Sequence, residues 1–172
     1  GHRVEGPRLD RIDAATSSAL SRLGNPISHA EQDESGLYTA QNKMRKVAET
    51  QRRGAAAMGG RSRETTNPWD SAENSVAQTT WESQAPDVFK FWRQPPANLS
   101  YRNKRERRKI HEHVYEGSWW VDLDAIEAEA FELMEHDPAQ AERFFGNRVV
   151  QGQGAWMSDE IWAKAYADAV AS

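Results

Sequence analysis

The stretch EQDESGLYT, residues 31–39, places the carboxylates of Glu31, Asp33 and Glu34 within four positions. It follows the weakly apolar run NPISHA, residues 25–30. We interpret that run as a short strand that ends at the acid pair Asp33 and Glu34. The strand is polar for a buried central strand, which normally carries residues such as Val and Leu.

Helices and strands are expected to alternate after the acid pair. The spacing of apolar residues over 40–57 predicts a helix whose bases fall largely on its outer face. The run RSRETTN, residues 61–67, predicts a strand that ends in two hydroxyls and an amide. The next expected elements are a helix with Ser71 as N-cap and Asn74 at its N3 position, and a strand over 88–92, VFKFW.

The rest of the sequence predicts helices. The expected helices are a short one over 16–24, a basic one over 103–115, one with an Asp124–Glu127 capping box that runs to about His136, one from Asp137–Pro138 to Gly146, and one capped by Ser158. The apolar patterns around Trp119, Trp120 and Trp162 indicate core positions. Trp69 and Trp92, which stand beside loops or bases, remain candidates for stacking on nucleic-acid bases.

This order of elements is that of an α/β protein. We expect a partial sheet of few short strands in residues 1–96. A mainly α-helical subdomain is expected to follow in residues 97–172.

Composition excludes several kinds of protein. The chain of 172 residues has no cysteine, so it has no disulfide and no thiolate metal site. No apolar run approaches the roughly 20 residues of a membrane helix, and the first residues lack the apolar core of a signal peptide. We therefore expect a protein of the cytoplasm. His111 and His113 diverge by about 200° on a helix, so we do not expect them to share a metal ion.

Charge is distributed in blocks. Residues 43–63 hold seven bases and one acid, residues 102–109 hold six bases and one acid, and residues 122–142 hold eight acids and no Lys or Arg. Such basic blocks can follow the phosphates of DNA, and the candidates here are Arg105, Arg107, Arg108 and Lys109. Alternatively, the block 102–109 pairs with the acidic stretch 122–142, and we favour this alternative slightly.

Carboxylates at the C-terminal edge of strands occupy the position where open α/β sheets bind ligands. One carboxylate there can hold Mg²⁺, directly or through water, and a second can orient an attacking water. A hydroxyl at the end of the neighbouring strand can then sense the γ-phosphate. Asp33 and Glu34 would be the acids, and Thr65, Thr66 or Asn67 would be the sensor.

Three stretches together resemble the large subunit of phage terminases. TSSALSRLGNPISHAEQDESGLYT, residues 16–39, is similar to the segment that contains the Walker B acids, in which a Ser-Arg-x-Gly run precedes the strand. RSRETTNPWDSAENSVAQ, residues 61–78, is similar to the coupling segment. Residues 101–148 resemble the region that joins ATPase to nuclease in terminases of phages that infect actinobacteria. The similarity extends from about Arg11 to the end of the chain.

The resemblance implies a part of a P-loop NTPase-like sheet and a role for each matching residue. Asp33 would be the Walker B acid on the Mg²⁺ side, and Glu34 would be the catalytic glutamate that activates water. Glu31 would take over one of these roles if the register slips by two residues. Thr65, Thr66 and Asn67 would form the coupling motif, and Arg22 matches the Ser-Arg-x-Gly arginine.

The resemblance also implies partners and missing parts. In the whole terminase these would be ATP with Mg²⁺, double-stranded DNA, the small subunit and the portal, with a possible homo-oligomer. The sequence contains no GxxxxGK[ST] motif to cradle the β- and γ-phosphates. We therefore expect an internal piece of a terminase, inactive by itself, with the P-loop upstream and a nuclease after about Ala171. The alternative is a non-catalytic helical adaptor or DNA-associated protein that uses the basic helix 102–109.

Overall fold

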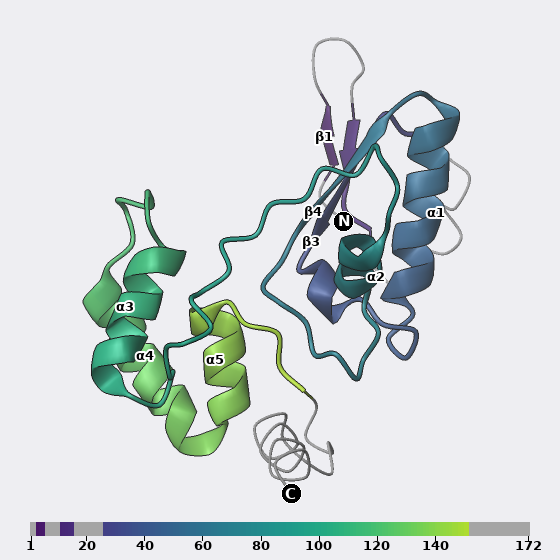
Figure 1. Ribbon diagram of the computed structural model, residues 1–172. Coiled ribbons are helices and arrows are strands. Elements are labelled where there is room, and N and C mark those ends of the chain that lie inside the picture. The colour runs from purple at the N-terminus through teal and green to yellow at the C-terminus, as the bar shows by residue number, and fades with distance from the viewer. Residues whose placement is uncertain (1–2, 6–10, 16–25, 152–172) are drawn as a thin grey trace, which may run out of the picture. The chain divides into compact units, whose positions relative to one another are not determined.

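The computed structural model describes residues 3–5, 11–15 and 26–151. It divides the chain into two units (Figure 1). The first unit consists of Gly1–Thr66 and Asn74–Val88, and the second unit of Asn67–Glu73 and Phe89–Ser172. The chain is therefore an α/β protein with a short parallel sheet and several helices. The helices expected over 16–24 and after Ser158 lie outside the described residues.

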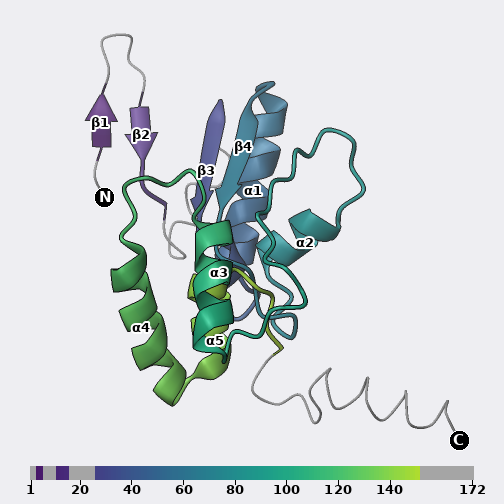
Figure 2. The same cartoon turned by 60° about the vertical axis from the view of Figure 1, so that its left-hand side comes forward.

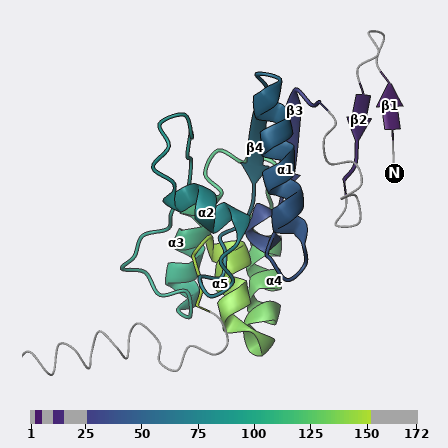
Figure 3. The same cartoon turned by 90° about the vertical axis from the view of Figure 1, so that its right-hand side faces the viewer.

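The first unit is built on a strand–helix–strand arrangement. Strand β3 (His29–Asp33) pairs in parallel with β4 (Arg61–Thr65), and helix α1 (Met44–Ala57) connects them. Figure 3 shows α1 lying along the two strands. This confirms the predicted order of strand, helix and strand. The unit also contains a small antiparallel pair, β1 (Arg3–Glu5) with β2 (Arg11–Asp13).

Alternation along β3 gives the sheet one covered face. Ala30 and Gln32 are buried, whereas the residues before and after them are exposed. The Nε2 of Gln32 donates to the carbonyl of Ala48 in α1 at 3.1 Å, and Val47 and Ala48 are buried on the same helix. The predicted apolar face of the helix therefore packs on this side of the sheet.

The turn into β4 requires glycine. Gly59 has a φ of 63°, and the amide of Gly60 donates to the carbonyl of Ala55 at 2.7 Å. A Cβ at Gly60 would lie 2.3 Å from the carbonyl oxygen of Ser28, so only glycine lets the chain pass there. The amide of Arg61 then bonds that same oxygen at 3.0 Å and starts the ladder.

The other face of the sheet is open and polar. His29, Glu31 and Asp33 are exposed on β3, and their register partners are Arg61, Arg63 and Thr65. A strand covered by helices on both faces would carry apolar residues on both. The described sheet is therefore covered on one side.

Helix α2 (Val76–Glu82) begins later than the sequence predicted. Its N-cap is Ser75, whose side chain accepts from the amide of Gln78, and Asn74 precedes the helix with a φ of 48°. Ser71 lies in the turn before it. The prediction of Ser71 as N-cap was therefore wrong, because the turn needs a left-handed residue before the helix and Asn adopts that conformation readily.

The predicted strand over 88–92 is absent from the structure. Its alternation of apolar and charged residues is strand-like, but a strand also needs a neighbouring ladder. Beyond Arg93, the run QPPA, residues 94–97, includes two prolines that have no amide hydrogen to donate.

Among its described residues, the second unit contains the helices α3 (Lys104–Val114), α4 (Leu123–His136) and α5 (Pro138–Gly146) (Figure 2). The side chains of Asn103, Asp122 and Asp137 cap them. Their core contains Tyr101, Ile110, Ala130 and Ala141. Within the described residues, no helix is long and apolar enough to cross a membrane.

The capping box predicted at Asp124 and Glu127 was wrong. Asp122 Oδ1 accepts the amides of Asp124 and Ala125, so α4 starts two residues earlier than expected. Glu127 instead turns inward, where it forms an ion pair with Arg107. The buried guanidinium of Arg107 needs a counter-charge, and Glu127 supplies it instead of capping the helix.

Tryptophan burial also differs from the prediction. Trp119 is 89% exposed and Trp120 is 68% exposed, in the turn between α3 and α4. The two rings contact each other edge to face, at 5.7 Å between centroids. By contrast, Trp69 is buried, with its ring 5.9 Å from that of Trp92, so it does not offer a stacking face. Trp162 lies outside the described residues.

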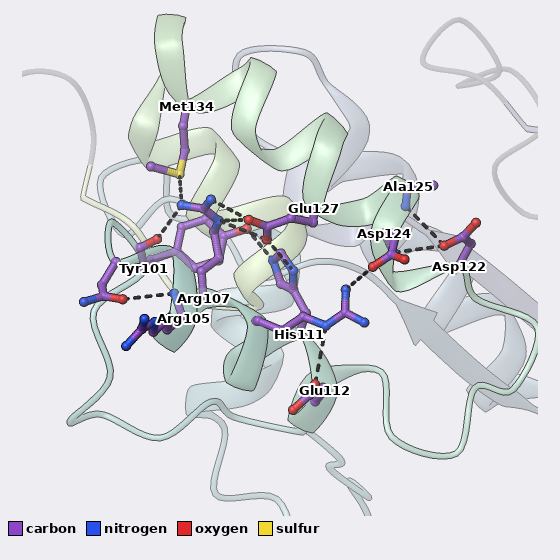
Figure 4. A network of polar contacts seen from close by, with 12 residues as sticks. Tyr101, Arg105, Arg107, His111, Glu112, Asp122, Asp124, Ala125, Glu127 and Met134 are labelled. Atoms are coloured by element: carbon purple, nitrogen blue, oxygen red, sulfur yellow. Dashed lines mark hydrogen bonds and ion pairs between the residues drawn. The ribbon is translucent and has the colours of Figure 1, made fainter.

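A polar network fills the centre of the second unit (Figure 4). The Arg107 side chain is 2% exposed, and its Nη2 lies 2.6 Å from Glu127 Oε1. Its Nη1 also bonds the carbonyl of Tyr101 at 3.2 Å. His111 is fully buried, with its Nε2 2.8 Å from the Tyr101 hydroxyl and its Nδ1 3.4 Å from Glu127 Oε2.

Burial sets the protonation of this network. Desolvation raises the pKa of Tyr101, so its hydroxyl keeps its proton and shares a hydrogen bond with His111 Nε2. The other ring nitrogen, Nδ1, faces Glu127 Oε2 at 3.4 Å. Desolvation lowers the pKa of His111 from 6.5 to about 4, against the opposing effect of Glu127.

The buried histidine predicts a pH dependence of stability. As pH falls from 6.5 to about 4, the unfolded chain binds a proton at His111 that the folded chain does not. The free energy of unfolding should therefore fall in this window, by on the order of 3 kcal/mol. Urea unfolding at several pH values measures it. His111→Gln should flatten the slope, whereas the exposed control His113→Gln should keep it; equal slopes in all three proteins would contradict the prediction.

Candidate functional site

The candidate site is the C-terminal edge of the β3–β4 pair. The parallel register places Asp33 opposite Thr65. The hydroxyl of Thr65 donates to Asp33 Oδ1 at 2.8 Å, and the amide of Glu34 bonds the same oxygen at 3.2 Å. The acid at the end of one strand and the hydroxyl at the end of its neighbour are therefore in direct contact.

A tight turn presents the second acid. Glu34 has φ 54° and ψ 42°, a left-handed conformation, and it precedes a 3-10 turn over Ser35–Leu37. The amide of Gly36 donates to Thr66 Oγ1 at 2.9 Å. Because Ser35 and Gly36 are buried, this bond attaches the turn after β3 to the end of β4. The turn fixes the backbone of Glu34 at the edge.

Glu31 lies farther from the edge. It is the middle residue of β3, two positions before Asp33. Its carboxylate is 3.2 Å from His29 Nε2 and 3.5 Å from Arg63 Nε. The carboxylate of Glu31 is therefore paired along the open face of the sheet, whereas Glu34 belongs to the turn at its end.

Tyr38 follows the same turn. Partial burial raises the pKa of its hydroxyl, and the charges of Asp33 and Glu34 raise it further. Its carbonyl accepts the amide of Val76, the first residue of α2. Tyr38 thus connects the acidic turn with α2 within the first unit. Its position in Leu-Tyr-Thr belongs to the terminase resemblance, but no local pattern indicates that it is partly buried beside the acids.

Asn67 belongs to the second unit, although it directly follows Thr66 in the chain. The segment Asn67–Glu73 is fixed there by several bonds. Arg143 Nε donates to the carbonyl of Pro68 at 2.6 Å, and Asp70 forms a parallel bridge with Val150. No sequence pattern indicates this role of Arg143, because RFFG is typical only of the end of a helix.

The four candidate DNA-binding residues of α3 divide into two groups. Arg107 is buried against Glu127, and Arg108 Nη1 lies 2.5 Å from the exposed Asp124. The structure therefore pairs two arginines of the basic block with the acidic stretch, as the favoured alternative expected. Arg105 and Lys109 are exposed on the helix.

The described residues contain no group of three His, Asp or Glu side chains that could hold a metal ion. At the edge, Asp33 is the carboxylate best placed for a cation. Both of its hydrogen bonds described above go to Oδ1, and Oδ2 takes part in neither. Mg²⁺ sites in phosphate-binding enzymes commonly use one or two carboxylates together with the substrate phosphates, and Asp33 fits that kind of site.

Comparison with known proteins adds no relative. No family model, curated protein or solved structure matches the chain.

The bond from Gly36 to Thr66 predicts an effect of the hydroxyl on the acidic turn. Thr66→Val keeps the side chain's shape but leaves the part-buried Gly36 amide without its acceptor. We expect a loss of about 1 kcal/mol in the free energy of unfolding and faster hydrogen exchange at the Gly36 amide. Thr66→Ser should restore both. Unchanged exchange in Thr66→Val would show that the bond does not hold the turn.

Proposed function

We propose that this chain is part of the large terminase subunit of a tailed phage, the ATP-driven motor that packages DNA. In this proposal the first unit is the end of the ATPase domain, and the second unit is the region that leads to the nuclease. The observation that supports it best is the contact between Thr65 and Asp33 at 2.8 Å, with Glu34 next in the chain. Two segments that separately resemble the Walker B and coupling segments meet there.

In this proposal the two acids have distinct tasks, and their geometry supports the division. Asp33 is held at the end of β3 by Thr65 and by the Glu34 amide, which suits a carboxylate that holds a cation through water. Glu34 extends from a turn fixed by Thr66, which suits a carboxylate that orients a water for attack. Mg²⁺ with ATP would supply the electrophilic phosphate and the neutralising charge when bound.

Thr65 and Thr66 suit the role of sensor and link. The Thr65 hydroxyl donates to Asp33, and the Thr66 hydroxyl accepts the amide of Gly36. A shift of the acidic turn would therefore also displace the end of β4. The chain then runs directly into Asn67–Glu73, which is anchored in the second unit. Asn67 follows Thr65 and Thr66 directly, so in this proposal a movement at the acids is passed along the backbone to the second unit.

The alternative of a non-catalytic DNA-associated protein has less support. Arg107 is buried, and Arg108 is paired with Asp124. The basic block therefore offers fewer cations to DNA than its composition suggests. We keep DNA as a partner of the whole motor, contacted through phosphates by the exposed bases, among them Arg105 and Lys109.

The chain by itself should hydrolyse no ATP above background. It has Asp33 and Glu34 but no GxxxxGK[ST] motif, so its sequence provides no P-loop cradle or lysine for the β- and γ-phosphates. A phosphate-release assay with ATP and Mg²⁺ tests this. Turnover by this chain that Glu34→Gln abolishes would contradict the prediction.

In the longer protein that contains this chain, Glu34→Gln should lower ATP turnover by roughly 10²–10⁴-fold while ATP still binds. The reason is that Gln keeps the shape but cannot accept a proton from the attacking water. Glu31→Gln is the matched control, because Glu31 lies on β3, three residues before Glu34, and its carboxylate is in ion pairs on the open face of the sheet. Loss of turnover in the control alone would move the role to Glu31.

Exposed bases of α3 should set the salt dependence of DNA binding. Replacing Arg105 and Lys109 with Gln should weaken binding to all duplex sequences alike. The log–log slope against salt should flatten by about 0.9 for each phosphate that the variant no longer neutralises. Arg108→Gln is the control, because its guanidinium already pairs with Asp124. Equal salt slopes for the double variant and the unsubstituted chain would show that these bases of α3 do not contact DNA.

A further inference from the structure

Two exposed phenylalanines lie in one short segment of the second unit. Phe89 is 89% exposed and Phe91 is 75% exposed. Lys90 between them and Trp92 after them are half-buried, so the segment alternates in burial and turns both phenylalanines outward. Two residues of backbone span at most about 7 Å, so the two rings form one continuous apolar surface. We call Phe89 and Phe91 the phenylalanine ridge.

Hydrogen bonds fix the phenylalanine ridge beside the end of the described chain. Trp92 Nε1 donates to the carbonyl of Asn147 at 3.1 Å, and Asn147 Nδ2 donates to the carbonyl of Arg93 at 2.9 Å. Three residues after Asn147, the amide of Val150 donates to the carbonyl of Trp69 at 3.3 Å. The ring of Trp69 also lies 5.9 Å from that of Trp92. The segment that carries the ridge and the segment that leaves α5 are therefore attached to each other.

Residues 152–172 lie outside the described residues, but their sequence has the pattern of an amphipathic helix. After the expected N-cap Ser158, apolar residues recur with the spacing of one helix face, namely Ile161, Trp162, Ala165, Tyr166 and Ala169. We call these five residues the C-terminal stripe. A helix of about 14 residues is marginal in water by itself, and packing of its apolar face stabilises it. The C-terminal stripe therefore needs an apolar surface to cover it.

The length of chain after Val150 allows the C-terminal stripe to reach the ridge. Ile161 follows Val150 by eleven residues, which span up to about 36 Å. Gly152 and Gly154 in this connection adopt the conformations that a reversal of the chain requires. A segment held by a short connection has an effective concentration in the millimolar range. The chain's own stripe therefore has an advantage over a partner from solution.

We propose that the C-terminal stripe docks as a helix on the phenylalanine ridge of the same chain. Trp162 and Tyr166 then meet Phe89 and Phe91, and such aromatic pairs contribute free energy beyond the burial of their area. A partner protein with an apolar helix would gain the ridge only by displacing this segment. The docking involves neither ATP nor the acids at the end of β3, so it does not depend on the terminase proposal.

Hydrogen exchange of the whole chain tests the docking. The amides of residues 163–169 should exchange slowly, because a docked helix opens less often than a free one. Replacing Phe89 and Phe91 together with Ser should speed this exchange by about tenfold or more, since the helix loses the burial of two phenylalanine rings. Phe131→Ser is the matched control, because Phe131 is 55% exposed on α4. Unchanged exchange in α3 verifies that each variant is folded.

A single thiol gives an independent readout, because the chain has no cysteine of its own. Ala165→Cys places the thiol within the C-terminal stripe, and Ala167→Cys places it about 200° away around the helix. The first thiol should react with an alkylating reagent about tenfold more slowly than the second. In the variant that lacks Phe89 and Phe91, the two thiols should react at similar rates.

Three outcomes would overturn the proposal. The first is fast exchange of residues 163–169 in the unsubstituted chain, which would show that the helix is not docked. The second is slow exchange that the two phenylalanine substitutions leave unchanged, or that Phe131→Ser relieves equally, since the segment would then pack elsewhere. The third is protection that increases with protein concentration, because the segment would then dock on a second copy.

Discussion

The parallel pairing of β3 with β4 is the constraint on which the candidate site depends. Two parallel strands need a crossover, and α1 supplies it by packing Val47 and Ala48 on one face of the sheet. The crossover brings both strands to the same edge, so that Asp33 meets Thr65. The glycine at position 60 permits this register, since a Cβ there would collide with Ser28. A shift of one residue would turn the acid and the hydroxyl to opposite faces.

A second constraint governs the helical unit. Arg107 is buried with Glu127, and His111 and Tyr101 complete their contacts. Breaking a buried pair from one side typically costs about 3–5 kcal/mol. A block of bases that resembles a DNA-binding helix thus includes a residue needed for the fold. Composition describes how many charges a helix has, but packing decides which of them face solvent.

Local patterns in the sequence were sufficient to predict the strand–helix–strand part of the first unit. The order β3, α1, β4 and the position of Asp33 beside a hydroxyl of the neighbouring strand were predicted, because connection and strand direction fix them. Features that depend on tertiary contacts were missed. Residues 88–92 alternate like a strand but have no ladder, and Trp119 and Trp120 look like core but stand in a turn. The spacing of Asp124 and Glu127 is that of a capping box, but Glu127 pairs with the buried Arg107 instead.

We propose that the acidic edge belongs to an ATP-driven motor whose phosphate cradle is encoded elsewhere in the same gene. Sequencing the DNA that flanks the coding segment tests this most directly. The account predicts that the reading frame continues upstream of Gly1 and encodes GxxxxGK[ST] after a strand. A start codon immediately before Gly1, or an upstream reading frame without that motif, would contradict it.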